Sequence, residues 1–76
     1  LEDFPIEAWH FLALCYGKLQ KYSLSSLALT EKFLLLNDLK NAKLQLKRAE
    51  QMNNDNDEVN SLILDLKFLI KQKESK

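Results

Sequence analysis

The 76-residue sequence contains one glycine, one proline and one cysteine, and each scarcity narrows what the chain can be. With so few helix-breaking residues, long helices are the default conformation. A single cysteine permits no internal disulfide, and one cysteine with one histidine cannot supply the about four ligands of a structural zinc site. We therefore expect no metal, no cofactor and a reducing, intracellular setting, cytoplasmic or nuclear.

The chain also lacks net charge and long apolar runs. Eleven basic residues balance eleven acidic ones, so no overall field favours nucleic acid or an anionic membrane. The longest apolar runs, 11–16 and 33–36, are far shorter than the roughly 20 residues of a membrane-spanning helix. We expect neither direct nucleic-acid binding nor membrane insertion. The basic residues of the third predicted helix should form a solvated face: Lys40, Lys43, Lys47 and Arg48.

What the sequence does contain predicts an all-α fold. Apolar residues make up 46% of the chain and charged residues 29%, which is a globular composition. The spacing of the apolar residues predicts antiparallel helical hairpins closed by a C-terminal capping helix. The four predicted helices span residues 5–21, 23–36, 38–53 and 57–74.

Polar residues mark the predicted helix ends. Pro5 suits a first helical position, because its missing N–H would be unpaired there anyway. One of the serines at 23, 25 and 26 is expected to cap the second helix, Asp38 the third, and Asn56 or Asp57 the fourth. The turn at 37–38 has neither glycine nor proline, so the second and third helices could equally be one kinked helix.

Three helices carry apolar faces that should be buried. The first is apolar on nearly every side, so it needs cover from more than one direction. The stripe of the third helix is Leu39, Ala42, Leu46, Ala49 and Met52. The stripe of the fourth, interpreted as core, is Val59, Leu62, Ile63, Leu66, Leu69 and Ile70.

Two segments resemble the helices of a tetratricopeptide repeat. Trp9, Leu12, Ala13 and Tyr16 match the pattern large-x-x-Leu-small-x-x-Tyr of its first helix. Ala42, Leu46 and Ala49 resemble the second helix, and residues 53–56 resemble the exit turn without its proline. The resemblance implies a right-handed stack of helix pairs that binds other proteins.

The register departs from that family. In a repeat of about 34 residues the Trp and the later Ala lie about 16 apart, whereas Trp9 and Ala42 are 33 apart. Residues 22–37 therefore look inserted, or form an additional half-repeat. Gln20 stands where the repeat usually has glycine.

A narrower resemblance concerns the dedicated assembly chaperones of ribosomal protein L4. The order Ala-Trp-x-x-Leu-Ala-x-Cys-Tyr, a spacer, a Leu/Ala helix and an acidic turn is similar to the C-terminal part of that family, as is the segment 57–67. The resemblance implies ribosomal protein L4 as client and a role in ribosome biogenesis. A basic client prefers an acidic binding surface, so the neutral charge balance of this chain does not add support to this resemblance.

No residue pattern predicts catalysis. Cys15 and His10 are separated by five residues, about 140° around a helix, so they do not form a nucleophile and base pair. We therefore do not expect an enzyme. Trp9, His10 and Tyr16 are the candidate partner-binding residues, because they lie on the first helix and aromatic side chains are enriched at interface hot spots.

The sequence as a whole predicts a binding surface. We expect a protein-binding helical-repeat module that acts as a scaffold or chaperone for a polypeptide client. The alternative is a structural or oligomerising helical element without a client. Residues 1–76 are interpreted as one all-α segment. Because the first helix is apolar on nearly every side and the last has a polar outer face, we expect this segment to be the C-terminal end of a longer helical-repeat domain. The client and the oligomeric state stay open.

Overall fold

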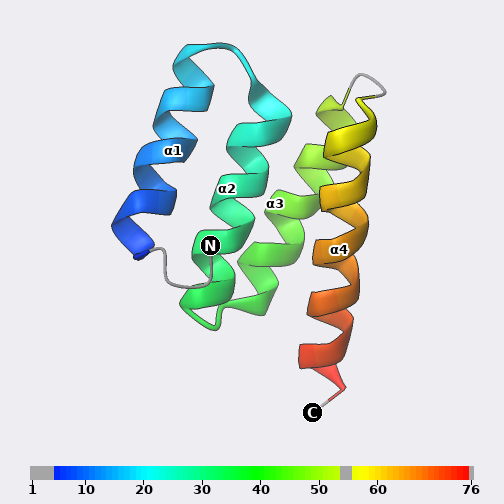
Figure 1. Cartoon of the computed structure of the whole chain (residues 1–76). Coiled ribbons are helices and arrows are strands. Elements are labelled where there is room, and N and C mark those ends of the chain that lie inside the picture. The colour runs from blue at the N-terminus through cyan, green and yellow to red at the C-terminus, as the bar shows by residue number, and fades with distance from the viewer. Residues whose placement is uncertain (1–4, 54–55, 76) are drawn as a thin grey trace.

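The computed structural model describes residues 5–53 and 56–75, and it shows an all-α fold. Successive helices run antiparallel and form hairpins (Figure 1). Within the described residues no helix is long and apolar enough to cross a membrane. The four helices are α1 (Ile6–Lys18), α2 (Tyr22–Leu35), α3 (Leu39–Met52) and α4 (Asp57–Glu74).

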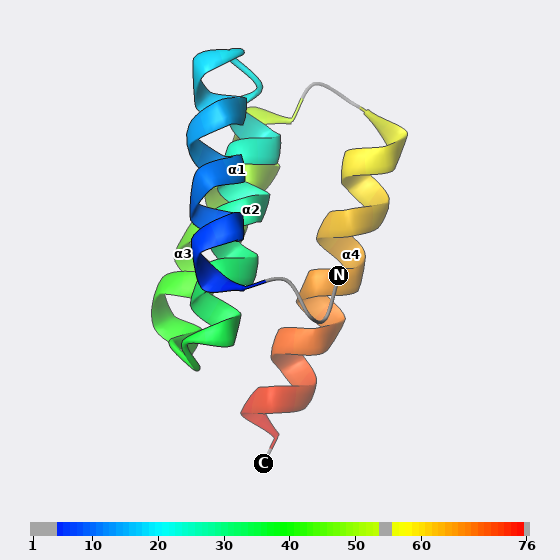
Figure 2. The same cartoon turned by 60° about the vertical axis from the view of Figure 1, so that its left-hand side comes forward.

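The second helix, α2, is the centre of the fold. It packs against α1 on one side, against α3 on the other, and also touches α4. Among the described residues α1 contacts neither α3 nor α4, and Figure 2 shows α4 standing apart from α1. The two outer helices therefore face each other across α2.

Three of the helices share one hydrophobic core. Alanines at Ala42 and Ala49 are 0% exposed and let α3 approach α2 closely. The first helix adds no residue to this cluster, since its buried contact with α2 is made by Ala13. The core residues are Leu27 and Leu34 of α2, Ala42, Leu46 and Ala49 of α3, and Val59, Ile63, Leu66 and Ile70 of α4.

The first two helices end in the same way. Gln20 has φ 61° and Asn37 has φ 60°, both left-handed. After each of them the next amide donates back into the helix, Lys21 to the carbonyl of Tyr16 and Asp38 to that of Phe33. This is the Schellman motif, which satisfies the last carbonyls and turns the chain sharply. It decides the open question at 37–38: α2 and α3 are separate helices.

Two of the predicted N-caps are confirmed. The Asp38 carboxylate accepts the amide of Asn41 at 3.2 Å, and Asn56 Oδ1 accepts the amides of Glu58 and Val59 at 2.9 and 3.2 Å. The side-chain hydrogen bond from Asn41 lowers the pKa of Asp38, since that bond favours the charged carboxylate. Residues 54–55 of the predicted exit turn lie outside the described residues.

The predicted serine caps of α2 are wrong. The residue before α2 is Lys21, which makes no capping bond through its side chain. Instead, Ser25 donates to the carbonyl of Ala13 at 2.8 Å, and Ser23 donates to that of Ala49 at 2.9 Å. The two hydroxyls thus tie α2 to the helices on either side. Pro5 precedes the first helical residue rather than occupying it, with an extended ψ of 157°.

The structure also corrects which helices form pairs. The resemblance grouped the helices predicted at 5–21 and 38–53, but α1 forms its hairpin with α2 and makes no contact with α3 among the described residues. Ser25, sixteen residues after Trp9, is the small residue that meets Ala13 across this hairpin.

The prediction that the apolar stripe of α4 is buried is only partly correct. Val59, Ile63, Leu66 and Ile70 are buried, whereas Leu62 is 45% and Leu69 37% exposed. In α3, Met52 is 40% exposed. A helix touched on one side by α2 and α3 buries a narrow face, so leucines beside that face stay accessible.

Candidate functional site

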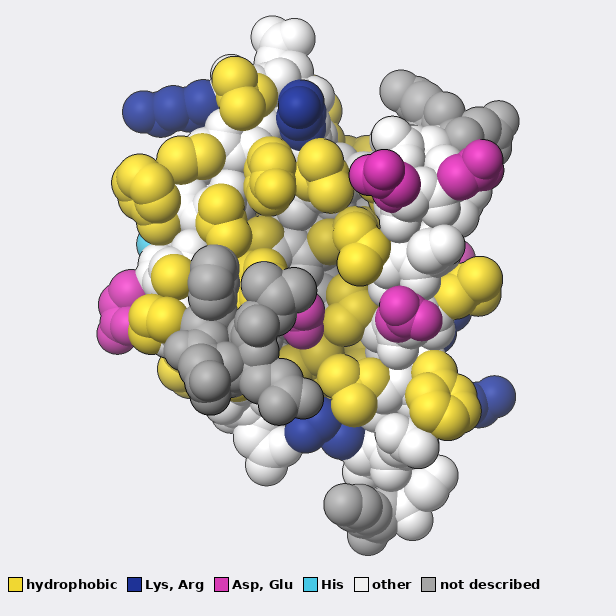
Figure 3. Space-filling model, viewed as in Figure 1, with side chains coloured by type: hydrophobic (Ala, Val, Ile, Leu, Met, Phe, Trp, Pro, Cys, Tyr) yellow, Lys and Arg dark blue, Asp and Glu magenta, His cyan; other side chains and the backbone are white. Residues whose placement is uncertain are grey.

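An apolar groove opens between α1 and α4, with α2 as its floor. Its volume is about 270 Å³, close to the lower end of the roughly 300–1,000 Å³ typical of ligand pockets. Figure 3 shows hydrophobic side chains gathered over this face of the molecule. The lining residues are Trp9, Leu12 and Tyr16 of α1, Leu24, Leu27, Ala28 and Glu31 of α2, and Leu62 and Leu66 of α4.

The α1 wall follows from helical spacing. Trp9, Leu12 and Tyr16 lie three and four residues apart and therefore share one face. All three are partly buried, because α1 rests on α2 without a further helix covering this face among the described residues. Ala13 lies beside them, buried against α2, where a larger residue would hold the helices apart.

The α4 wall is made by residues on the edge of its buried face. Leu66 belongs to the core and is 7% exposed, whereas Leu62, one turn earlier, is 45% exposed. A leucine with this much accessible surface stabilises the fold little and can still bury area against another molecule. Leu62 is therefore the wall residue most available to a partner.

Glu31 is the acidic residue among the groove-lining side chains. It is partly buried on α2 and continues the register of Leu24, Leu27 and Ala28, three to seven residues earlier. Burial raises the pKa of Glu31 above its ordinary 4.5, because a carboxylate loses hydration there. The groove thus combines apolar walls with one desolvated negative charge.

The three candidate partner-binding residues are not all in one place. Trp9 and Tyr16 line the groove, but His10 is exposed and is not among the lining residues. The Nδ1 atom of His10 lies 3.2 Å from Lys32 Nζ. Because an ammonium group only donates, that ring nitrogen accepts the bond. The structure therefore brings Trp9 and Tyr16 together and directs His10 elsewhere.

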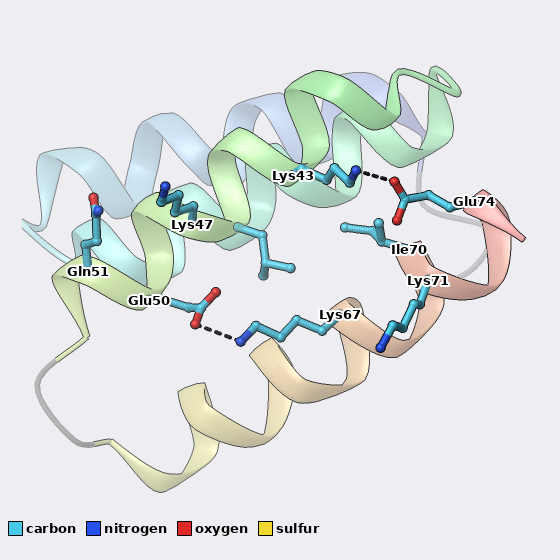
Figure 4. A pocket seen from close by; sticks show the side chains of 9 residues that line it. Lys43, Lys47, Glu50, Gln51, Lys67, Ile70, Lys71 and Glu74 are labelled. Carbon is cyan, nitrogen blue, oxygen red and sulfur yellow. Dashed lines mark ion pairs between the residues drawn. The ribbon is translucent and has the colours of Figure 1, made fainter.

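A second cleft, between α3 and α4, is lined with lysines. Glu50 of α3 pairs with Lys67 of α4 at 2.8 Å, and Lys43 of α3 pairs with Glu74 of α4 (Figure 4). Lys47 and Lys71 line the same cleft. Two of its four lysines are thus neutralised by carboxylates of the facing helix, so the cleft joins α3 to α4 by ion pairs.

The described residues contain no group of three or more His, Cys, Asp or Glu side chains able to hold a metal ion. Cys15 is a partly buried free thiol on α1. Comparisons with protein-family models, with curated proteins and with solved structures find no match for this chain.

Two features of the groove are not among the sequence predictions. Glu31 interrupts an apolar stripe on α2, at a position where the spacing from Leu24 and Leu27 calls for a hydrophobic residue. A lone charge in such a register is a signal that the sequence alone provides. The exposure of Leu62 has no such signal, because it depends on which side of α4 meets α2 and α3.

Proposed function

We propose that this chain is a protein-binding helical module that holds an apolar segment of a polypeptide in the groove between α1 and α4, as a scaffold or chaperone does. The groove carries the proposal, since three helices present seven apolar or aromatic side chains and Ala28 to one accessible hollow. Rigid helices preorganise such a surface, which lowers the ordering cost of binding.

The narrower form of the proposal has ribosomal protein L4 as the client, in ribosome biogenesis. It is supported by the sequence resemblance around Trp9 and Tyr16, both of which line the groove. An intracellular setting, cytoplasmic or nuclear, fits a chain with one cysteine and no disulfide.

The experiment is a pull-down from native lysate with two matched variants of one helix. Leu62→Gln changes the groove wall, and Leu64→Gln changes a residue of α4 that is 65% exposed and does not line the groove. We expect a stoichiometric partner with the wild type and with Leu64→Gln, and its loss with Leu62→Gln. Retention of that partner by Leu62→Gln would contradict the groove as binding site. Mass spectrometry decides whether the partner is ribosomal protein L4.

A second candidate function, an oligomerising element, is favoured by the outer face of α4. Leu64 and Phe68 are one turn apart, and each is 65% exposed. Two such faces could pair helix to helix. Mass that rises with protein concentration in sedimentation, and returns to that of a monomer in Phe68→Gln, would favour this function.

A further inference from the structure

The groove holds a charge that no described residue compensates. The Glu31 carboxylate makes no ion pair or hydrogen bond with residues 5–53 or 56–75. Burial raises its pKa, and the positive charge of the chain's N-terminal amino group, the smaller effect, lowers it. The adjacent cation, Lys32, lies 3.2 Å from His10 Nδ1 and 5.6 Å from the centroid of the Phe33 ring. It is thus directed to α1 and to its own neighbour. Removing a carboxylate from water costs free energy unless cations and hydrogen bonds compensate it, and a bound cation would offset that cost.

The groove has the length of a short helical contact. From Trp9 to Tyr16 the α1 wall covers eight residues, about 10 Å along the helix axis. Two turns of a docked helix have the same length and present side chains at i, i+3 or i+4, and i+7. The opposite wall presents Leu62 and Leu66, again one turn apart. Apolar anchors at helical spacing therefore match both walls.

Resting on the proposed function, we infer that the occupant of the groove is an amphipathic helix with two or three leucine-like anchors and one Lys or Arg that pairs with Glu31. The anchors supply the buried area, while the basic side chain fixes register and orientation. A charge-assisted hydrogen bond is stronger in a site that excludes water than at an open surface. A helix with the same anchors and no basic residue would desolvate Glu31 further without giving it this bond.

The chain carries its own reporter for a binding test. Trp9 is the single tryptophan of the sequence and lies on the groove wall, so its fluorescence reports occupancy. The probes are three alanine-based peptides without tryptophan, about 15 residues long, since shorter helices are marginal in water. Each has leucine at i, i+3 and i+7, and they differ only in one flanking position: Lys, Gln or Glu. The protein is the full chain.

The inference predicts binding in the order Lys, Gln, Glu. The Lys peptide should bind about tenfold more tightly than the Gln peptide, the ratio expected for one charge-assisted hydrogen bond. In Glu31→Gln this ratio should fall to about one. In Glu7→Gln, which removes an exposed carboxylate from α1 outside the groove, the tenfold ratio should persist. Circular dichroism verifies that both variants keep their helices.

Every other outcome of the binding test overturns a specific part of the proposal. If the ratio of Lys-peptide to Gln-peptide affinity is the same for the wild type and Glu31→Gln, the role of Glu31 is wrong, while the groove of the proposed function stands. If no peptide alters Trp9 fluorescence, the helical occupant is wrong, and the pull-down with Leu62→Gln decides the proposed function separately. If the protein alone self-associates, and Glu31→Gln and Leu62→Gln abolish that association, the occupant is a second copy of this chain.

Discussion

Substitutions at two adjacent residues of α4, Leu62 and Ile63, test which side of this helix is buried in the core. Ile63 is 5% exposed within the core cluster, and Leu62 is 45% exposed on the groove wall. Ile63→Ala removes buried methyl groups and leaves a cavity, so it should cost about 3 kcal/mol. Leu62→Ala gives up area that is half in water already, so it should cost less than about 1 kcal/mol.

These magnitudes are large against the stability of such a small fold. A domain of this length has an unfolding free energy of roughly 4–11 kcal/mol, so Ile63→Ala should remove about a quarter or more of it. Urea unfolding followed by circular dichroism measures both variants, and the slope with denaturant shows whether they unfold from the same native state. Equal losses for Leu62→Ala and Ile63→Ala would refute the packing of α4 and, with it, the accessible groove wall.

Three further predictions concern a turn, a charge and a helix. Gln20→Gly should stabilise the protein by about 1 kcal/mol and raise its melting temperature by about 4 °C, because φ 61° is strained for glutamine. An unchanged melting temperature in calorimetry would contradict the left-handed conformation of residue 20. Glu31→Gln should stabilise by about 0.5 kcal/mol at pH 7. Because the pKa of Glu31 is raised in the folded state, the stability that Glu31 contributes is fully present below pH 4.5 and is lost as pH rises through the folded pKa. The stability gain of Glu31→Gln should therefore vanish near pH 4 in urea titrations. A gain that does not depend on pH would exclude the carboxylate as its cause. A chain ending at Asn53 lacks four residues of the core cluster and should aggregate; a soluble, fully helical monomer in sedimentation and circular dichroism would show that α4 is dispensable.

Local signals in the sequence are sufficient for most of the fold. The scarcity of glycine and proline, the stripe through Ala42, Leu46 and Ala49, and the caps at Asp38 and Asn56 each act within a few residues, so each can be predicted without knowing the neighbours. The outcome is an all-α chain with these residues buried or capping as expected.

What the sequence left unpredicted depends on contacts between helices. The serines of α2 resemble caps, yet the hydroxyls of Ser23 and Ser25 bond carbonyls of α3 and α1. Glutamine rarely adopts positive φ, so the sharp end of α1 at Gln20 has no local signal comparable with glycine. Of the three residues predicted to bind a partner, Trp9 and Tyr16 line the groove and His10 does not. Glu31 and Leu62 line it only because α1 and α4 face each other across α2.

Site-specific photo-crosslinking tests the central claim, that a partner helix docks between α1 and α4, most directly. A photoreactive amino acid replaces Leu62 in one protein and Leu64 in another, two residues of one helix on opposite sides of the groove boundary. We expect a crosslink from position 62 to an amphipathic helix of another protein and none from position 64. Crosslinks from position 64 alone, or to copies of the same chain alone, would contradict this claim.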